Sequence, residues 1–326
     1  MRQYGGADMN IENYQYFVVA AEELNFTKAA NRLFMTQQAL SKHIDKLEKL
    51  YNVRLFNREP PMSLTPAGEC LYRNMCQVIN AERQMHLELD DFLEKSNRNL
   101  TVGISYYKSG LFMPRILKEF SEIHPEVCVH VKEKNLLSNL EELRLGKMDL
   151  LMGYEMPENS IYSSYPLYTE RVVLVISREI AHKYFSQQEI DEFQESQCIP
   201  LERFRDCPFM KMDSFTWMGK ILDKYWEEKQ LTPNVVVNSS SIITVLNCCV
   251  EGMGATLIPA FYLRNLAEEQ REKIYVFCWD YPGVTAEGAI LCLKSSYVST
   301  VIKDFIKIAQ KVGLEYETQI LRDLEL

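Results

Sequence analysis

Residues 25–69 constrain the fold of this chain more than any other stretch, because they have the spacing of two helices joined by a tight turn. Ala29, Ala30 and Leu33 recur at helical intervals, and Thr27 is expected to cap the helix that carries them. Thr36 is expected to cap the next helix. Its apolar positions lie three and four residues apart, at Leu40, Ile44, Leu47 and Leu50. A basic wing follows, so the segment predicts a winged helix-turn-helix.

The polar face of the second helix carries residue types that read double-stranded DNA. Gln37, Gln38 and Ser41 occupy its first turns, where a recognition helix contacts base edges. Glutamine can pair with adenine through two hydrogen bonds, and serine can donate or accept one. Basic residues are better suited to phosphates or a flanking minor groove, and these are Lys28, Arg32, Lys42, Lys46, Arg54 and Arg58. Together with Thr27 and Thr36 they form the predicted DNA-binding site.

A pair of amphipathic helices with a solvated polar face would show a similar stripe without binding DNA, and for one helix alone that is the commoner explanation. Here the second capped helix is followed by three further features at fixed positions. These are Val53-Arg54-Leu55-Phe56, Arg58 and Leu64-Thr65-Pro66-Ala67-Gly68. Their combination favours the DNA-binding interpretation.

Residues 9–68 resemble the N-terminal winged helix-turn-helix of LysR-type transcriptional regulators. The matching pieces are Phe26-Thr27-Lys28-Ala29-Ala30, Leu33, Thr36-Gln37, Ala39-Leu40-Ser41, Ile44, Leu47-Glu48, Leu55-Phe56, Arg58 and Leu64-Thr65-Pro66-Ala67-Gly68. The family usually opens a few residues before its first helix, at a position matching Met9 here, so residues 1–8 are interpreted as an extension or a misplaced start. The resemblance implies a DNA-binding domain over residues 9–66.

Three positions depart from the family pattern. Gln38 stands where proline is common, and Lys42 stands where arginine is frequent. Asp45 places a negative charge on the DNA-facing side. These departures bear on which operator sequence is read, not on how the domain docks.

Charge and composition fit a multi-domain globular protein. A net charge of −9 is unfavourable for DNA binding, but residues 9–66 hold seven Lys/Arg against six Asp/Glu, so most of the excess acid lies downstream. Non-specific affinity should therefore be modest, with two copies acting together. The 326 residues contain no apolar run of membrane-spanning length and no signal-peptide core, which favours a cytoplasmic protein without a membrane partner.

The cysteines and histidines predict neither a metal site nor a cofactor. The nine cysteines include no C-x-x-C pair, and the five histidines show no i, i+4 pairing, so reduced thiols are expected. Cys198 and Cys207 have a separation similar to that of the redox pair in peroxide-sensing members of the family. That pair follows the strand expected at 208–212, whereas Cys198 and Cys207 precede it, so redox sensing is not the favoured interpretation.

Residues 67–97 predict one long helix with a heptad seam. The seam positions are Leu71, Met75, Val78, Glu82, Met85, Leu89 and Phe92, with Glu82 as a polar break. The seam could pack on its own chain or on a second copy. The family resemblance favours a homodimer through this linker helix and implies homotetramers; RNA polymerase is a further expected partner. Ser96-Asn97-Arg98-Asn99 is the expected hinge.

From Leu100 onward, strands alternate with helices, which predicts parallel sheets with helices on both faces. We expect subdomain I at 100–170 plus 276–310 and subdomain II at 171–275, within an effector-binding domain of residues 100–326. Residues 311–326 contain no recognised motif. This region resembles the effector-binding domain of the same family, which is similar in fold to periplasmic binding proteins. The matching segments include Leu145-Gly146-Lys147-Met148-Asp149-Leu150 and residues 250–259. The predicted fold class is α+β multi-domain.

A small-molecule effector is expected between the two subdomains, beyond the carboxyl ends of the strands, where helix N-termini favour anions. The candidate residues of subdomain I are Ser105, Tyr106, Tyr107, Asn135, Ser138 and Tyr154. Those of subdomain II are Ser214, Phe215, Thr216, Ser239, Ser240 and Ser241. Hydroxyls, amides and aromatic rings suit a small polar molecule with an anionic end. Each of these residues could instead cap a helix or form a turn without meeting a ligand.

Two functions from different classes remain open at this point. The first is a sequence-specific transcription regulator that a small effector controls. The second is a small-molecule receptor or enzyme with an accessory N-terminal helical domain. No catalytic motif such as a G-x-S-x-G elbow or H-E-x-x-H is present, and we therefore expect no enzyme.

Overall fold

The computed structural model describes residues 11–93, 99–154, 156, 160–196, 198–214, 216–279, 281, 285–294 and 296–323. The chain divides into two compact units. Unit 1 comprises Met1–Tyr165 and Ile290–Ile308, and unit 2 comprises Pro166–Ala289 and Ala309–Leu326. Within the described residues, no helix is long and apolar enough to cross a membrane. The expectation about residues 1–8 concerns positions outside the described residues.

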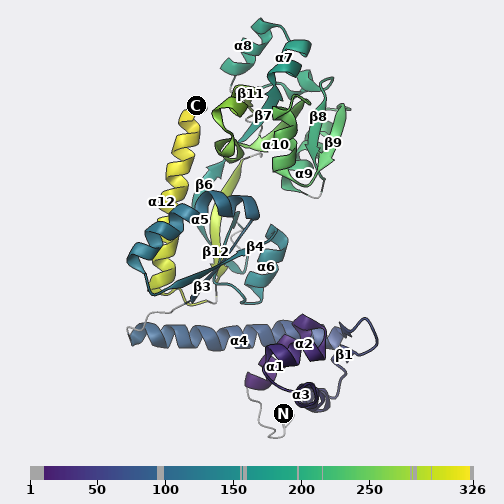
Figure 1. The fold of residues 1–326 in the computed structure, drawn as a ribbon, viewed down its shortest axis with the longest axis vertical. Helices are drawn as coiled ribbons and strands as arrows, with labels where there is room; N and C mark the ends of the chain where they lie inside the picture. Colours follow the sequence, from purple (N-terminus) through teal and green to yellow (C-terminus); the bar gives the residue numbers. More distant parts are fainter. Residues whose placement is uncertain are drawn as a thin grey trace. The chain divides into compact units, whose positions relative to one another are not determined.

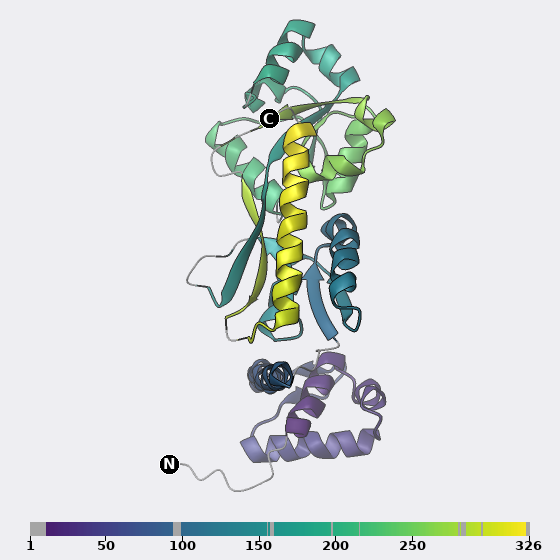
Figure 2. The same ribbon diagram turned by 90° about the vertical axis from the view of Figure 1, so that its left-hand side faces the viewer.

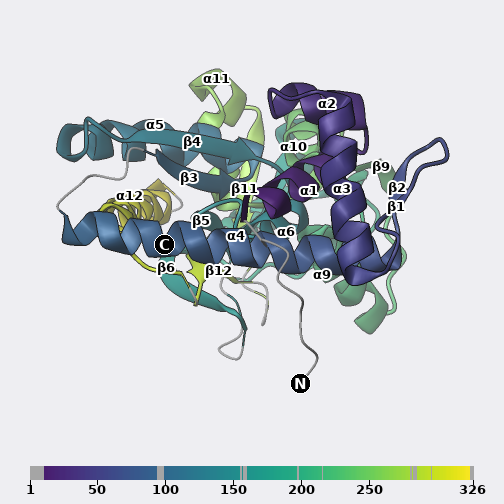
Figure 3. The same cartoon turned by 90° about the horizontal axis from the view of Figure 1, so that it is seen from below.

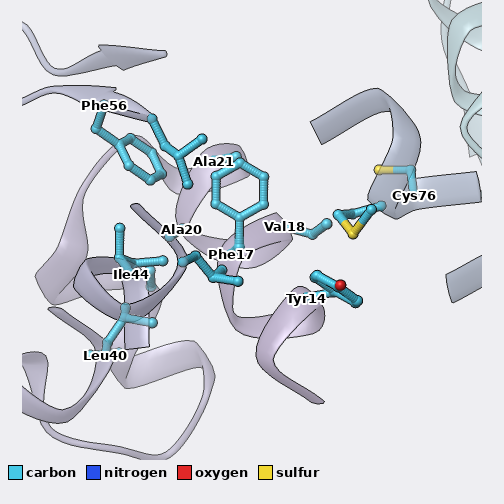
Figure 4. Packing of buried hydrophobic residues seen from close by; sticks show 14 of the residues in the cluster. Tyr14, Phe17, Val18, Ala20, Ala21, Leu40, Ile44, Phe56 and Cys76 are labelled. Carbon is cyan, nitrogen blue, oxygen red and sulfur yellow. The ribbon is translucent and has the colours of Figure 1, made fainter. Parts of the chain in front are cut away.

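The N-terminal part of unit 1 is a three-helix head with a small wing (Figure 1). Its elements are α1 (Ile11–Glu23), α2 (Phe26–Arg32), α3 (Gln37–Tyr51), β1 (Phe56–Asn57) and β2 (Ser63–Leu64). Figure 4 shows Phe17 of α1 among the apolar side chains that the other elements supply. Leu40, Ile44 and Phe56 are almost completely buried in this cluster. Leu40, Ile44 and Leu47 of the predicted apolar stripe therefore belong to the core of the head, whereas Leu50 is only partly buried.

Of the two predicted N-caps in the head, the one of α3 is confirmed and the one of α2 is not. Thr36 caps α3 as expected, since its hydroxyl accepts a hydrogen bond from the Ala39 amide at 3.2 Å. The prediction that Thr27 caps the preceding helix is wrong. Asn25 is the cap, and its side-chain oxygen accepts from the amides of Thr27 and Lys28, both at 3.0 Å. Both residue types are good caps, and only the backbone shows that the helix begins two residues earlier than a cap at Thr27 would place it.

Thr65-Pro66-Ala67-Gly68 connects the wing to the long helix α4 (Pro66–Phe92). The Thr65 hydroxyl accepts from the Gly68 amide at 3.0 Å and donates to the Arg54 carbonyl at 2.6 Å. A Cβ atom at position 68 would lie 2.1 Å from the Leu55 carbonyl oxygen, so only glycine fits there. Figure 3 shows the β1–β2 wing extending beside α3.

Helix α4 is shorter than the predicted 67–97, because it ends at Phe92. It packs beside α1 in the head and is seen end-on in Figure 2. Of the predicted hinge, residues 96–98 lie outside the described residues, and Asn99 begins the next strand.

The first sheet has the strand order β4-β3-β5-β12-β6. Its strands are β3 (Asn99–Ile104), β4 (Cys128–Glu133), β5 (Leu150–Tyr154), β6 (Tyr162–Glu170) and β12 (Ala286–Leu293). Helices α5 (Tyr106–Ile123) and α6 (Leu136–Arg144) connect β3, β4 and β5. Because β3 pairs in parallel with both β4 and β5, the predicted βαβ pattern is present in this part of unit 1.

The second sheet belongs to unit 2 and has the order β11-β7-β10-β8-β9. Its strands are β7 (Val172–Ser177), β8 (Phe209–Met212), β9 (Val235–Ser239), β10 (Ala255–Pro259) and β11 (Ile274–Cys278). The other elements are α7 (Arg178–Tyr184), α8 (Gln187–Glu195), η1 (Leu201–Phe204), α9 (Trp217–Glu228), α10 (Ile242–Val250), η2 (Ala260–Asn265) and α11 (Glu268–Arg271). The chain's final helix is α12 (Thr300–Asp323). Figure 1 shows α10 against the β7–β10–β8 part of this sheet.

The second sheet is not all parallel, in contrast to the prediction. Strand β7 pairs antiparallel with both β10 and β11. All six residues of β7 are buried, and a continuous apolar run indicates a strand covered on both faces without giving its direction. The predicted boundary at residue 276 also falls inside β11, which pairs with β7 along its whole length. Strand β6 and helices α7 and α8 were not predicted, and α12 continues beyond residue 310, the expected end of subdomain I.

Candidate nucleic-acid interface and effector face

The recognition helix α3 presents its predicted polar face outward. Gln37 and Gln38 are exposed and Ser41 is half-buried, whereas Leu40 and Ile44 on the opposite side are fully buried. The N-cap at Thr36 fixes where the helix begins, which places these polar residues in its first two turns. This is the arrangement in which a helix can enter the major groove and contact base edges.

The six basic residues of the predicted DNA-binding site fall into two groups. The first group is exposed and forms no ion pair with any described residue: Lys28, Lys42, Lys46 and Arg54. The second group already has carboxylate partners. Arg32 contacts Glu22 at 2.8 Å and Glu23 at 3.1 Å, so α2 is tied to α1. Only the first group offers a full positive charge to phosphate without breaking an internal contact.

Arg58 at the wing belongs to the second group. Its Nη2 atom donates to Asp45 at 2.6 Å and to Glu48 at 3.1 Å, and its guanidinium lies 5.7 Å from the centre of the Phe26 ring. The hydrogen bond to Asp45 raises the pKa of Arg58 above its ordinary value. The negative charge that Asp45 adds to α3 is therefore matched locally, and it positions the wing arginine beside the recognition helix.

In unit 1, the candidate effector residues follow three neighbouring parallel strands. Ser105, Tyr106 and Tyr107 follow β3, and Tyr154 ends β5. Parallel pairing brings the carboxyl ends of these strands to one edge of the sheet. Asn135 caps α6 after β4 by accepting from the Ser138 amide at 2.9 Å, and both residues are exposed.

Sequence reasoning missed Lys108 at this edge. Lys108 lies in the first turns of α5, is only 6% exposed, and places its ammonium 4.1 Å from the centre of the Tyr154 ring. A lysine ammonium above the face of a tyrosine ring is attracted to that ring. Helix α5 begins at Tyr106, so Lys108 lies inside the helix and not among the residues that directly follow the strand.

In unit 2, most candidate effector residues already act as caps or turn residues. The Thr216 hydroxyl accepts from the Gly219 amide at 3.0 Å and donates to the Asp213 carbonyl at 2.7 Å. Ser241 caps α10 in the same way. Ser239 accepts from the Ser241 amide, Ser214 accepts from Lys211, and Ser240 is exposed. Phe215 lies outside the described residues.

The two cysteines considered as a redox pair have different surroundings. Cys198 is exposed, whereas Cys207 is buried, and burial raises the pKa of Cys207 to about 12. The thiolate is the form that reacts with oxidants, so a buried thiol with this pKa is a poor redox sensor. Among the described residues, no group of three or more His, Cys, Asp or Glu could hold a metal ion.

A winged helix-turn-helix head, a long helix and an α/β region with a polar face at the strand ends define a DNA-binding regulator with a ligand domain. Family models agree with both parts. The model described as "Bacterial regulatory helix-turn-helix protein, lysR family" matches residues 11–69, and the "LysR substrate binding domain" matches residues 94–313. The chain belongs to the LysR family of bacterial regulators.

Relatives with curated names support this assignment over nearly the whole chain. The uncharacterized HTH-type transcriptional regulator YcgK of Bacillus subtilis is 27% identical over 315 residues, which cover 93% of this chain and 94% of YcgK. The Hca operon transcriptional activator HcaR of Escherichia coli is 26% identical over 311 residues, which cover 93% and 98% of the two chains. Both names denote regulators and not enzymes.

Solved structures show the same fold. A full-length OxyR variant from Pseudomonas aeruginosa has a TM-score of 0.67 at 19% identity, with 94% of this chain and 95% of that chain covered. Full-length CbnR in complex with its target DNA has a TM-score of 0.59 at 15% identity, with 93% and 100% covered. The chain is thus a LysR-type DNA-binding transcription regulator with an effector-binding domain.

Proposed function

We propose that this regulator reads its operator with Gln37, Gln38 and Ser41, while Lys28, Lys42, Lys46 and Arg54 bind the flanking phosphates. The observation that carries this proposal is the exposed polar face at the capped start of α3, opposite a fully buried apolar face. Glutamine and serine side chains supply base-edge hydrogen bonds, and exposed unpaired cations supply affinity that falls with salt. Thr27 and Thr36 are exposed beside this face and can donate to phosphate oxygens.

The regulator works as a homodimer through α4. One side of this helix exposes large apolar residues: Val78 is 40% exposed, Met85 50%, Leu89 49% and Phe92 79%. These are the distal positions of the predicted heptad seam, and a second copy would remove them from water. Two heads held together multiply a modest affinity for each half-site. Two such dimers would form a homotetramer, and the DNA-bound regulator would contact RNA polymerase. Because it acts on bacterial DNA, the protein works in the cytoplasm.

The effector is a small polar molecule with an anionic end. Lys108 supplies the positive charge at the strand ends of unit 1, and Ser105, whose hydroxyl does not cap α5, supplies a hydrogen-bonding group. The ring of Tyr154 covers the lysine and offers an apolar wall. In unit 2 the candidate hydroxyls of Thr216 and Ser241 already accept hydrogen bonds from backbone amides as helix caps. A hydrogen bond from either hydroxyl to the effector would be formed in addition to that cap.

A gel-shift titration of the full-length protein on the intergenic DNA upstream of its own gene tests the DNA contacts. Gln37→Ala should weaken binding to this DNA by about 1–3 kcal/mol and leave binding to unrelated duplexes nearly unchanged. Gln188→Ala removes an exposed glutamine of unit 2 and serves as the matched control. Equal retardation by wild type and Gln37→Ala would remove Gln37 from the base-reading set. Failure of the wild-type protein to bind any duplex at low salt would contradict the whole proposal.

A further inference from the structure

Unit 2 contains a pocket of about 190 Å³. None of its lining residues belongs to the candidate effector residues discussed above. Its walls are mostly aliphatic, with two arginines among them. The lining residues are Ala260, Leu263, Arg264, Arg271, Ile274, Val276 and Ile320. Ala260, Leu263, Ile274 and Ile320 are buried, so the interior of the pocket is apolar.

One wall of this pocket comes from the end of α12. The family model for the ligand domain stops at residue 313, whereas α12 continues to Asp323. Arg264 donates to the Gln319 side chain at 2.7 Å, and its guanidinium lies 4.2 Å from the centre of the Tyr316 ring. These contacts hold the last turns of α12 against unit 2 and bring Ile320 to the pocket. The pocket is therefore built partly from residues that the family model does not include.

Among the described residues, no carboxylate pairs with either arginine of the pocket. Arg271 donates from Nη2 to the Leu263 carbonyl at 3.0 Å, and the acceptor of Arg264 is the neutral amide of Gln319. Neither guanidinium forms an ion pair with any residue in the part of the chain that the structure describes. The nearby carboxylate of Glu317 lines an adjoining smaller cavity and accepts from the Thr169 amide at 3.1 Å. Two uncompensated positive charges thus stand beside an apolar interior.

We propose that this pocket binds a small amphiphilic carboxylate. An aliphatic or single-ring body would lie against Leu263, Ile274 and Ile320, and its carboxylate would accept hydrogen bonds from Arg264 and Arg271. Guanidinium–carboxylate bonds are charge-assisted and planar, and they gain strength where water is partly excluded. The size also fits, because an apolar cavity of about 150 Å³ holds one benzene ring.

Calorimetric titration of the full-length protein with cyclohexanecarboxylate, and separately with cyclohexanecarboxamide, tests this proposal. The two probes have the same ring and differ in charge. The carboxylate should bind with one site per chain, and the amide should bind at least about tenfold more weakly because it forms no charge-assisted bond. Equal binding of both probes, or no binding of the carboxylate at millimolar concentration, would overturn the proposal.

Three variants place the binding in this pocket. Arg271→Gln, at an exposed position that should not disturb folding, should weaken carboxylate binding about tenfold. Arg205→Gln removes an exposed arginine of the same unit that pairs with Asp206 and should leave binding unchanged. Lys108→Met, at the proposed effector face, should also leave it unchanged. An unaffected Arg271→Gln variant, or a loss with Lys108→Met, would assign the bound carboxylate to another site and overturn the proposal.

Discussion

Asp45 lies on the proposed DNA-facing side of α3, where a negative charge would repel phosphate. The structure places it 2.6 Å from Arg58, which also contacts Glu48 at 3.1 Å. Glu48 in turn accepts from the Leu55 amide at 2.7 Å, so it has a separate structural role at the start of the wing. Asp45 therefore offsets the charge of Arg58 and fixes the position of its side chain.

Asp45→Asn should raise the affinity for unrelated duplex DNA, because it removes a negative charge and releases Arg58 toward a phosphate. The slope of log K against log salt should steepen by up to about 0.9 for each head, the value for one more phosphate contact. Fluorescence anisotropy with a non-operator duplex at several salt concentrations measures this slope. Asp191→Asn, which removes an exposed acid of α8, is the control. An unchanged slope would mean that Arg58 does not reach phosphate.

At the scale of elements, α4 has two different faces. Met75, Cys76 and Leu87 are buried within unit 1, whereas Met85 and the seam positions around it are open. The predicted heptad seam therefore has two parts. Its first part, which includes Met75, packs on its own chain, and its distal part, from Met85 to Phe92, is exposed and available to a second copy. Packing on the same chain therefore holds for the first part of the seam, and packing on a second copy stays a prediction for its distal part.

Met85→Asp should dissociate the proposed dimer, because each copy would bring an unpaired carboxylate into an apolar seam. The cost should be at least about 3 kcal/mol for the pair. Light scattering should then report the mass of a single chain at concentrations where the wild type is larger. Gln77→Asp adds the same charge at an exposed position outside the seam and should not change the mass. A Met85→Asp protein with the wild-type mass would exclude this part of α4 from the interface.

Helix α4 is also tied to the first sheet by an ion pair. Arg83 donates to the buried carboxylate of Asp149 at 2.6 Å, and Asp149 accepts from the Thr101 amide at 2.8 Å. Burial raises the pKa of Asp149 above its ordinary value, and the charge of Arg83 limits that rise. A carboxyl group with a raised folded-state pKa holds its proton more tightly when folded. Its contribution to stability is therefore present at low pH and is lost as pH rises through the folded-state pKa.

Arg83→Gln should destabilise the protein more at pH 8 than at pH 4.5. Without the arginine the pKa of Asp149 rises further, so the ionised carboxylate becomes costlier while the protonated form is little affected. At pH 8 we expect a loss of about 2 kcal/mol, below the value for a fully buried pair because Arg83 is partly exposed. Denaturant unfolding at both pH values measures the difference, with Arg73→Gln on the exposed side of α4 as control. Equal losses at the two pH values would contradict this role of Asp149.

At the scale of the whole molecule, strand β5 connects two features of unit 1. Asp149, which binds Arg83 of α4, directly precedes β5, and Tyr154, which contacts Lys108, ends it. Lys147 adds a second connection, since it pairs with Glu22 of α1 at 2.8 Å and contacts the Tyr72 ring. A ligand that prefers one position of this strand would thereby favour one arrangement of α4 and the head, as effector control requires.

Lys108→Met should abolish the thermal stabilisation that an anionic effector gives to the full-length protein. A saturating effector at about 100 times its dissociation constant contributes about 2.7 kcal/mol to the free energy of unfolding. A thermal-shift screen with metabolites identifies the stabilising compound, and the variant is then compared with wild type. Lys118→Met removes an exposed lysine from the same helix and serves as control. Retained stabilisation in Lys108→Met would exclude this lysine from the effector face.

The sequence alone was sufficient for the DNA-binding head and for much of the chain's organisation. The reason is local: caps such as Thr36, the three-and-four spacing of Leu40, Ile44 and Leu47, and the Thr65-Pro66-Ala67-Gly68 turn act within a few residues of chain. Such short-range patterns can be recognised in the amino-acid sequence without knowledge of the tertiary structure. The same holds for β3, β4 and β5, whose alternation with helices indicates parallel pairing.

Only the tertiary structure decided features that join distant residues. The antiparallel direction of β7, the Arg58–Asp45 and Arg83–Asp149 pairs and the burial of Lys108 against Tyr154 each connect segments that no short-range pattern relates. The pocket at Ile320 likewise exists only because residues of η2, β11 and α12 line it together. Periodicity shows which face of a helix or strand is apolar. Which other element that face packs against depends on how whole elements pack, and the sum of many contacts across the chain decides this.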